Sequence, residues 1–362
     1  MDAMGYALAR RARKAGTLLV ATTASVMLLG AVCAAPAHAT VSSIDVGDTT
    51  YYANMHPTFK DLPAGVAFDE SSNTLTLDNA HIKSTGYNDA IAFQGSTDDV
   101  LTVNLIGNNT LTGCASNSLS DGLTAGPGQD LIFKGKGTLT VSGNDGISSG
   151  GKITIKSGTI NARGFDNTGI EAGNGIAIKG GKVSASGKDW AMWTMLGKIS
   201  NNYAHLGKIK GKLGPCATFT AGGKKWMVAN DPNETYLVLV KSKKSGKSVK
   251  VNTQRFGGYT YKVGVIGPKA FSGSKMKSLT IGKNVETIGK QAFSKTKKLK
   301  TLNMRGFDRQ FAHVNKKAFK DCGAKGGKKL TVHCGKSASY EKKQFKKFLV
   351  KHGMSKKVKV VK

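Results

Sequence analysis

The chain has 362 residues, and its 54 Lys and Arg against 22 Asp and Glu give it a formal net charge of +32. This length gives room for two domains. Beyond residue 40, no apolar run approaches the ~18 residues that a membrane-spanning helix needs. The charge is uneven, because residues 231–362 contain 34 Lys and Arg against 6 Asp and Glu, whereas residues 40–230 contain 16 against 15. The composition therefore excludes a bundle of membrane spans and predicts a polyanion-facing part joined to a nearly neutral one.

The N-terminal residues have the pattern of a secretory signal peptide. Basic residues at 10–14 precede an apolar run over 17–35, and a small-x-small cleavage motif follows at 37–39. A retained membrane anchor is the alternative, but no stop-transfer charges follow the run. We expect residues 1–39 to be removed and the mature chain, beginning at Thr40, to be exported.

The mature chain has four cysteines, namely Cys114, Cys216, Cys322 and Cys334. Only Cys322 and Cys334 are near neighbours in sequence, so they are the candidate pair for a disulfide across one repeat turn. Four cysteines allow three pairings, and the sequence alone does not choose between them. Isolated buried thiols are the alternative.

Short strand-like segments repeat through the first part of the mature chain. They share alternation of polar residues with Leu, Ile, Val or Ala, and Gly, Asn, Asp or Ser bound them. They cover 74–77, 101–105, 138–141, 152–155, 159–162 and 182–185. Three of them continue into the same kind of ending, namely Thr-Leu-Thr-Val-Ser-Gly at 138–143, Thr-Ile-Asn-Ala-Arg-Gly at 159–164 and Lys-Val-Ser-Ala-Ser-Gly at 182–187.

Residue identity that recurs at the period of one coil is typical of a β-solenoid. A coil of ~20–25 residues cannot bury its inward side chains alone, whereas stacked coils bury them and pair their backbones. An antiparallel β-sandwich has similar strands and turns, but it does not require the same residues to recur. We expect a cap before about Phe68 and an irregular closing structure between Trp190 and Trp226.

A second repeat lies in the basic part of the chain. Ala-Phe pairs at 270–271, 292–293 and 318–319 follow Ile-Gly, Ile-Gly and Val-Asn, at separations of 22 and then 26 residues. This period lies within or near the ~20–29 residues of leucine-rich repeats. Each unit is expected to supply one strand with alternating Leu or Ile, and then a helical or 3₁₀ segment whose Phe fills the core.

The last part of the chain is expected to close the repeats. Residues 337–351 place Tyr340, Phe345, Phe348 and Leu349 on one apolar helical face amid lysines, and a short strand follows at 358–361. The predicted fold is mainly β, with a right-handed parallel β-solenoid domain at 40–230. A short, basic leucine-rich-repeat domain with a C-terminal capping helix follows at 231–362.

On these motifs the chain resembles bacterial surface leucine-rich-repeat proteins whose units carry an Ile-Gly-x-x-Ala-Phe signature. The resemblance covers roughly 250–362. The coils at 40–187 resemble β-solenoid modules of bacterial cell-surface proteins, some of which are labelled carbohydrate-binding. These families imply adhesion or ligand binding at the envelope and contribute no catalytic residues. The chain lacks the sortase-type C-terminal signal of many such proteins, so we expect it to be secreted or held non-covalently at the cell surface.

The rival hypothesis is a polysaccharide lyase or hydrolase, because β-helices also support such enzymes. Clustered carboxylates would then recur at the coil period. Asp121 and Asp145 do recur 24 residues apart, but a turn-capping role explains both. The histidines are scattered without metal-ligand spacing. We therefore predict no catalytic site, no metal and no cofactor.

Two sets of residues are candidates for ligand binding. Trp190, Trp193 and Tyr203 lie in one irregular stretch where exposed rings would stack on sugars, although large aromatics also plug the ends of cores. The lysines of the capping helix, Lys342, Lys343, Lys346 and Lys347, stand for the wider basic surface. We expect a monomer that binds anionic envelope or matrix polymers, and glycans through the solenoid. No motif pairs the lysines with stacking aromatics, so no specific nucleic acid is expected.

Overall fold

The structure is a computed structural model, and it describes residues 41–97, 99–116, 119–201, 206–214, 216–230, 234–242, 248–307, 312–324, 326–335 and 342–362. The predicted signal peptide lies outside the described residues. The described chain is mainly β, as predicted. None of its helices combines the length and the apolar character that a membrane crossing needs.

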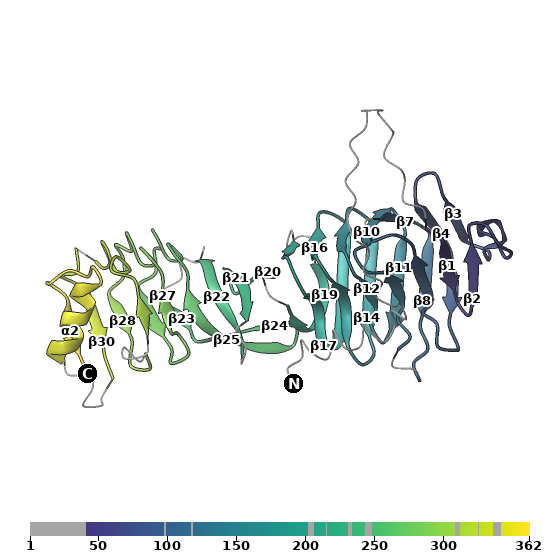
Figure 1. Ribbon diagram of the computed structural model, residues 1–362. Coiled ribbons are helices and arrows are strands. Elements are labelled where there is room, and N and C mark those ends of the chain that lie inside the picture. Colours follow the sequence, from purple (N-terminus) through teal and green to yellow (C-terminus); the bar gives the residue numbers. More distant parts are fainter. Residues whose placement is uncertain are drawn as a thin grey trace, which may run out of the picture. The chain divides into compact units, whose positions relative to one another are not determined.

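Residues 74–213 wind into stacked coils with strands on three faces (Figure 1). The first face holds β4 (Thr74–Asp78), β7 (Val100–Ile106), β10 (Asp130–Gly135), β13 (Lys152–Ile155), β16 (Gly175–Ile178) and β18 (Ile199–Asn201). The second holds β5 (His81–Lys83), β8 (Asn108–Thr112), β11 (Thr138–Gly143), β14 (Thr159–Gly164), the first half of β17 (Lys182–Thr194) and β19 (Leu206–Leu213). The third holds β6 (Ile91–Gln94), β9 (Leu123–Ala125), β12 (Ile147–Ser149), β15 (Thr168–Ala172) and the second half of β17. Neighbouring strands on each face are parallel, which confirms the predicted solenoid.

Apolar columns run through the inside of the stack, because the register places equivalent residues directly above one another. One column on the first face consists of Leu101, Leu131, Ile153, Ile176 and Ile199, each at most 1% exposed. Each such side chain contributes about 1.5–3 kcal/mol by leaving water. Since side chains alternate along a strand, the same register fixes which residues form rows on the outside.

Antiparallel strands cap the first coil, as expected. This cap holds β1 (Ser43–Val46), β2 (Thr49–Tyr52), the 3₁₀ helix η1 (Phe59–Asp61) and β3 (Val66–Asp69). β1 pairs antiparallel with β2 and β6, and β3 pairs antiparallel with β4. β3 and β4 thus form a strand–turn–strand arrangement at the start of the solenoid. It covers strand edges that would otherwise invite pairing with other chains.

The solenoid continues further than the sequence indicated. We expected irregular structure after Trp190, but β17 runs through it, and β18 and β19 still pair in parallel with the preceding coil. The next sheet begins at Thr218, and its hairpin of β21 and β22 spans residue 230, where we expected the domain boundary. The change of sheet therefore lies between Leu213 and Thr218.

The basic repeats are built on two further sheets. One contains β20 (Thr218–Ala221), β21 (Lys224–Asn230), β22 (Thr235–Ser242), β24 (Thr253–Phe256), β25 (Tyr259–Ile266), β27 (Thr287–Ile288) and β29 (His313–Val314). The other contains β23 (Ser248–Val251), β26 (Ser278–Ile281), β28 (Thr301–Asn303), β30 (Thr331–His333) and β31 (Lys359–Val361), all parallel. The predicted strand at 358–361 is thus present as β31.

Three loops connect these sheets and stack on each other through their phenylalanines. The rings of Phe271 and Phe293 lie 5.7 Å apart, and those of Phe293 and Phe319 lie 5.2 Å apart, with interplanar angles of 13°. All three side chains are fully buried. Helix α2 (Lys342–Lys351) buries Phe345 and Leu349 and closes the stack, because His352 at its end accepts a backbone hydrogen bond from Phe319. The predicted capping helix is therefore present.

We expect the middle ring to matter most for stability. Phe293→Ala should lower the free energy of unfolding by about 3–5 kcal/mol, because it opens a cavity between two rings that remain in place. Urea unfolding of the full chain measures this loss. The matched control is Phe348→Ala on α2, which is only half-buried and should cost clearly less. An equal loss in both variants would contradict the role assigned to the ring stack.

Candidate functional site

The outer side of the second solenoid face carries two rows of polar side chains. Registered strand pairs place Thr110, Thr140, Asn161 and Ser184 in one row, and Thr112, Ser142, Arg163, Ser186 and Lys210 in the other. The intervening residues, such as Val141 and Ala162, are buried in the core. The rows arise because successive side chains of a strand point to opposite faces and because equivalent strands of neighbouring coils lie side by side.

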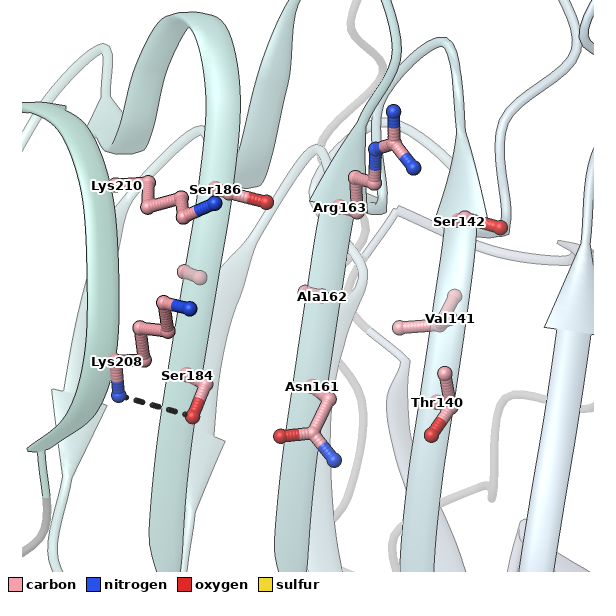
Figure 2. Close-up of a pocket in the computed structure, with 11 residues that line it drawn as sticks. Thr140, Val141, Ser142, Asn161, Ala162, Arg163, Ser184, Ser186, Lys208 and Lys210 are labelled. Atoms are coloured by element: carbon pink, nitrogen blue, oxygen red, sulfur yellow. Dashed lines mark hydrogen bonds between the residues drawn. The ribbon is translucent and has the colours of Figure 1, made fainter.

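An open groove lies where β11, β14, β17 and β19 run side by side (Figure 2). Its volume is about 360 Å³, and Thr140, Asn161, Ser184 and the three cations Arg163, Lys208 and Lys210 contribute to its lining. Across four strands it is about 14 Å wide, from strand spacings of 4.7–4.9 Å. We refer to it as the β11–β19 groove. A shallow, open groove of this kind fits a stretch of extended polymer better than a small ligand that needs an enclosed pocket.

A second depression of about 520 Å³ continues from this groove at the end of β14 and the middle of β17. The two share Arg163, Ser186 and Lys210, and the second adds the ring of Phe165 and the side chain of Lys188. The Arg163 guanidinium lies 5.4 Å from the centre of the Phe165 ring, within the range of a cation–π contact. Gly164, Gly187 and Gly211 also line it, so ligand atoms can approach the backbone closely.

The groove lies in the positive half of the solenoid. Residues 41–130 contain 2 Lys and Arg against 11 Asp and Glu, whereas residues 131–230 contain 14 against 4. The nearly neutral total of this part therefore hides two halves of opposite sign. Arg163, Lys208 and Lys210 are exposed, and none has an ion-pair partner among the described residues. The groove accordingly favours ligands that carry negative charge.

This groove was not predicted from the sequence, although most of its lining residues belong to a repeated motif. The three repeated endings at 138–143, 159–164 and 182–187 were used to predict the fold. Their third and fifth residues are the outward ones, and they line the groove. Lys208 and Lys210 carried no such signal, because β19 follows a segment that we expected to be irregular.

The predicted aromatic site is divided by the structure. Trp190 is half-buried and faces Lys212, whose Nζ lies 5.4 Å from its ring and 5.3 Å from the ring of Tyr259. Trp193 is half-buried elsewhere on β17, in register with Glu171. The two indoles make no ring contact with each other in the described part of the chain. Tyr203 lies outside the described residues.

The strands around Trp190 are held together by buried contacts. The Tyr261 hydroxyl accepts a hydrogen bond of 2.8 Å from the backbone N–H of Leu213, and burial raises the pKa of Tyr261 to about 12. Gly211 donates to the carbonyl of Gly257. Trp190 thus borders a packed junction between strands. This position agrees with the alternative that its ring closes the end of a core instead of binding sugar.

The lysines predicted on the capping helix are accessible. Lys342, Lys343 and Lys347 are exposed and Lys346 is half-buried, whereas Phe345 and Leu349 between them are buried. The first turn of α2 has no acidic residue. Lys342 and Lys343 are the first two residues of α2, so they lie at the positive end of the helix dipole, where cations are unfavourable.

The predicted disulfide between Cys322 and Cys334 is not formed, which corrects that prediction. The buried Cys322 thiol lies 3.4 Å from the hydroxyl of Thr296, and burial raises the pKa of Cys322 to about 11. The Cys334 thiol instead donates to the carbonyl of Val361 at 3.4 Å. Each sulfur therefore has a different local partner, so nearness in sequence did not indicate pairing.

The carboxylates of the solenoid corners cap backbone groups in successive coils. Asp89 accepts from the N–H of Asp121, Asp121 from that of Asp145, and Asp145 from that of Thr168, at 2.7–2.9 Å. Asp89, Asp121 and Asp145 are all at least nine-tenths buried. This ladder confirms the turn-capping interpretation of Asp121 and Asp145. Among the described residues, no three His, Cys, Asp or Glu side chains lie close enough together to hold a metal ion.

Comparisons with known proteins agree with this architecture. A family model described as carbohydrate-binding domain-containing protein matches residues 62–194, which include most of the β11–β19 groove. A second model, the BspA type leucine rich repeat region, matches residues 260–348 in six copies. Searches of curated proteins and of solved structures found no match. The predicted order of a carbohydrate-binding-type module followed by surface-type repeats is confirmed, and such families are typically binding domains without catalysis.

Asp48 provides a pH-dependent test of carboxylate capping. Its carboxylate accepts hydrogen bonds from Ser84, Thr85 and Gly86, and those from Thr85 contribute most to lowering its pKa to about 2. Because the folded pKa lies below the ordinary 3.8, this contribution to stability is present above about pH 4 and is lost as the pH falls towards 2.

We therefore expect Asp48→Asn to lower the midpoint of thermal unfolding at pH 7, and the difference from the parent chain to vanish near pH 2. The matched control is Glu70→Gln, since Glu70 is exposed and has no hydrogen-bond partner among the described residues. A difference that persists unchanged from pH 7 to pH 2 would show that the charge of Asp48 does not stabilise the fold.

Proposed function

We propose that the protein is an exported binding protein of the cell surface whose β11–β19 groove binds glycans with acidic groups. The observation that carries this proposal is a single open groove that brings three cations, Arg163, Lys208 and Lys210, next to the polar side chains of Thr140, Asn161 and Ser184. Hydroxyl and amide groups exchange hydrogen bonds with sugar hydroxyls, and the cations attract carboxylates or sulfates. The match to a carbohydrate-binding family over 62–194 supports this ligand class.

The proposal has a second part, which concerns the basic region. Residues 231–362 carry a net charge of +28, so we infer that this region holds the monomeric protein non-covalently at anionic polymers of the envelope or matrix. Lys342, Lys343, Lys346 and Lys347 belong to this surface. Such binding releases counterions and weakens as salt rises.

Removal of residues 1–39 and action outside the cell belong to the same proposal. The basic residues at 10–14, the apolar run at 17–35 and the cleavage motif at 37–39 support it. We also propose that Trp190 has a structural role, and that Trp193 and Tyr203 are at most secondary sugar contacts. The surface-type families found for both parts of the chain agree with this location.

A paired substitution tests the groove. Arg163→Ser with Lys210→Ser should weaken binding to acidic glycans on an array by about tenfold or more, because charge-assisted hydrogen bonds contribute roughly 1.5–3 kcal/mol each. The control is Lys134→Ser with Lys152→Ser on the first solenoid face, which removes the same charge from exposed positions. Equal loss in both variants, or unchanged binding in the groove variant, would contradict the assignment.

We further infer that the bound glycan is not cleaved. Asp121 and Asp145 are buried and hold backbone N–H groups, so neither is arranged as a general acid or base. Incubation of the full chain with acidic polysaccharides, with and without Ca²⁺, should release no fragments by size-exclusion chromatography. Cleavage that disappears in Asp121→Asn or Asp145→Asn would instead establish the lyase or hydrolase alternative.

A further inference from the structure

About a third of the lysines of residues 231–362 lie on the three stacked loops. These loops, at 267–277, 289–300 and 315–324, contain eleven lysines and no arginine, and Asp321 is their only carboxylate. All eleven lysines are exposed, and none has an ion-pair partner in the described part of the chain. The outer rows of the neighbouring parallel sheet are instead mostly neutral, with Ser278 and Thr301 among their members. The loops therefore form a positively charged surface beside a mostly neutral one.

The loops repeat at a nearly constant distance, so some of their lysines stack in pairs across neighbouring loops. Phe271 donates a backbone hydrogen bond to the carbonyl of Ala292, and Phe293 donates to that of Ala318. With the ring spacings of 5.7 and 5.2 Å, these bonds place equivalent residues one above another. Two such pairs are Lys275 with Lys297 and Lys290 with Lys316. We call the exposed lysines of the three loops the lysine ladder.

Two lysines of the ladder occupy backbone positions that disfavour them. Lys269 has φ of +53° and Lys295 has φ of +57°, both in the left-handed region. The residue equivalent to Lys295 in the first loop is Gly273, with φ of +72°. Glycine adopts this conformation without strain, whereas a lysine side chain is disfavoured there. Gln291 and Asp321, the equivalents of Lys269 and Lys295 in other loops, are also left-handed, with φ of +55° and +56°, so the conformation belongs to the repeat, and two of its positions carry lysine.

The chemistry of the ladder selects one kind of partner. Lysine is a hydrated point charge on a flexible stem and lacks the planar fork of arginine, so it suits a polymer with repeated charges rather than one shaped group. Single-stranded nucleic acids bind surfaces that also offer stacking aromatics. The rings of Phe271, Phe293 and Phe319 are fully buried beneath the loops. A linear acidic polysaccharide, whose charges recur along one chain, fits this surface best.

We propose that the lysine ladder is the track on which the basic region binds a linear acidic polysaccharide, with the polymer running across the three loops. This rests on the proposed polyanion binding of residues 231–362 and assigns it to one surface of that region. Each loop presents its lysines to the same polymer strand, so affinity comes from many weak contacts and from the release of counterions. The lysines of α2 lie outside the stack and contribute little.

Two fourfold charge reversals separate this surface from the rest of the region. The ladder variant is Lys275→Glu, Lys290→Glu, Lys297→Glu and Lys316→Glu in the full chain. The matched control changes Lys342, Lys343, Lys346 and Lys347 on α2 to Glu, which alters the net charge equally and places acids at the favourable end of the helix dipole. Binding to alginate, a linear polyuronate, is measured by biolayer interferometry between about 0.05 and 0.5 M salt.

We expect the ladder variant to lose affinity by about tenfold or more at low salt. The slope of log affinity against log salt should fall by about one for each lysine that contacts the polymer. The α2 control, which changes four lysines of the same basic surface outside the three loops, should lose clearly less affinity and less of the slope than the ladder variant. An equal loss in the two variants, or a loss in the control alone, overturns the ladder while the basic region remains a polyanion binder. A parent chain that does not bind alginate, polyphosphate or DNA refutes the proposed function itself.

A second variant keeps the test independent of folding effects. Lys269→Gly with Lys295→Gly removes two charges and relieves two left-handed lysines, so its thermal unfolding midpoint should equal or exceed that of the parent chain. Its affinity for alginate should nevertheless fall by several-fold. Unchanged affinity overturns the ladder. Tighter binding of the parent chain to polyphosphate or duplex DNA than to alginate, at equal charge concentration, overturns the choice of a polysaccharide.

Discussion

Register between stacked parallel coils is the constraint on which the rest of the structure depends. Each strand hydrogen-bonds to the equivalent strand of the next coil, so one aliphatic residue, such as Ile153, fixes the place of Ile176 above it. Because side chains alternate, a buried column of this kind creates an exposed row beside it. The stacked loops of the repeat region follow the same rule, with phenylalanine rings in place of aliphatic columns. Both candidate binding surfaces are thus by-products of core stacking, and their chemistry depends only on the outward residues.

The corners of the coils also need hydrogen-bond acceptors, and buried aspartates supply them. A sharp turn leaves backbone N–H groups without strand partners, and a buried N–H without an acceptor is costly. Asp89, Asp121 and Asp145 provide those acceptors from one coil to the next. A carboxylate held in this way is shielded and already hydrogen-bonded, so it is a poor proton shuttle. The same residues that suggested an enzyme by their period are therefore better explained by the architecture that produces the period.

Most of the fold could be predicted from the sequence, but fewer of the residues in the candidate sites could. Repeats predicted the parallel solenoid and the phenylalanine loops, since identity at a fixed period reports stacking directly, and the apolar helical face of Phe345, Phe348 and Leu349 predicted α2. The repeats could not show that β19 continues the solenoid, because Lys208 and Lys210 belong to no repeated motif. Nor could spacing show that Cys322 and Cys334 find different partners, since that depends on which way each side chain points after its loop or strand. The conformations of Lys269 and Lys295 were equally hidden, because lysine gives no local signal for a left-handed backbone.

The two surfaces proposed here differ in how they select a ligand, and this difference argues that they act together. The β11–β19 groove combines three cations with hydroxyl and amide groups, so it distinguishes sugars by hydrogen bonds as well as charge. The lysine ladder offers charge alone, and charge alone gives fast but weakly selective binding that salt screens. When one polymer engages the ladder, it raises the effective concentration of neighbouring polymer segments at the groove, so the combined affinity exceeds that of either surface. On this proposal, selectivity resides in the solenoid and retention in the basic repeats, where most of the positive charge of the mature chain lies.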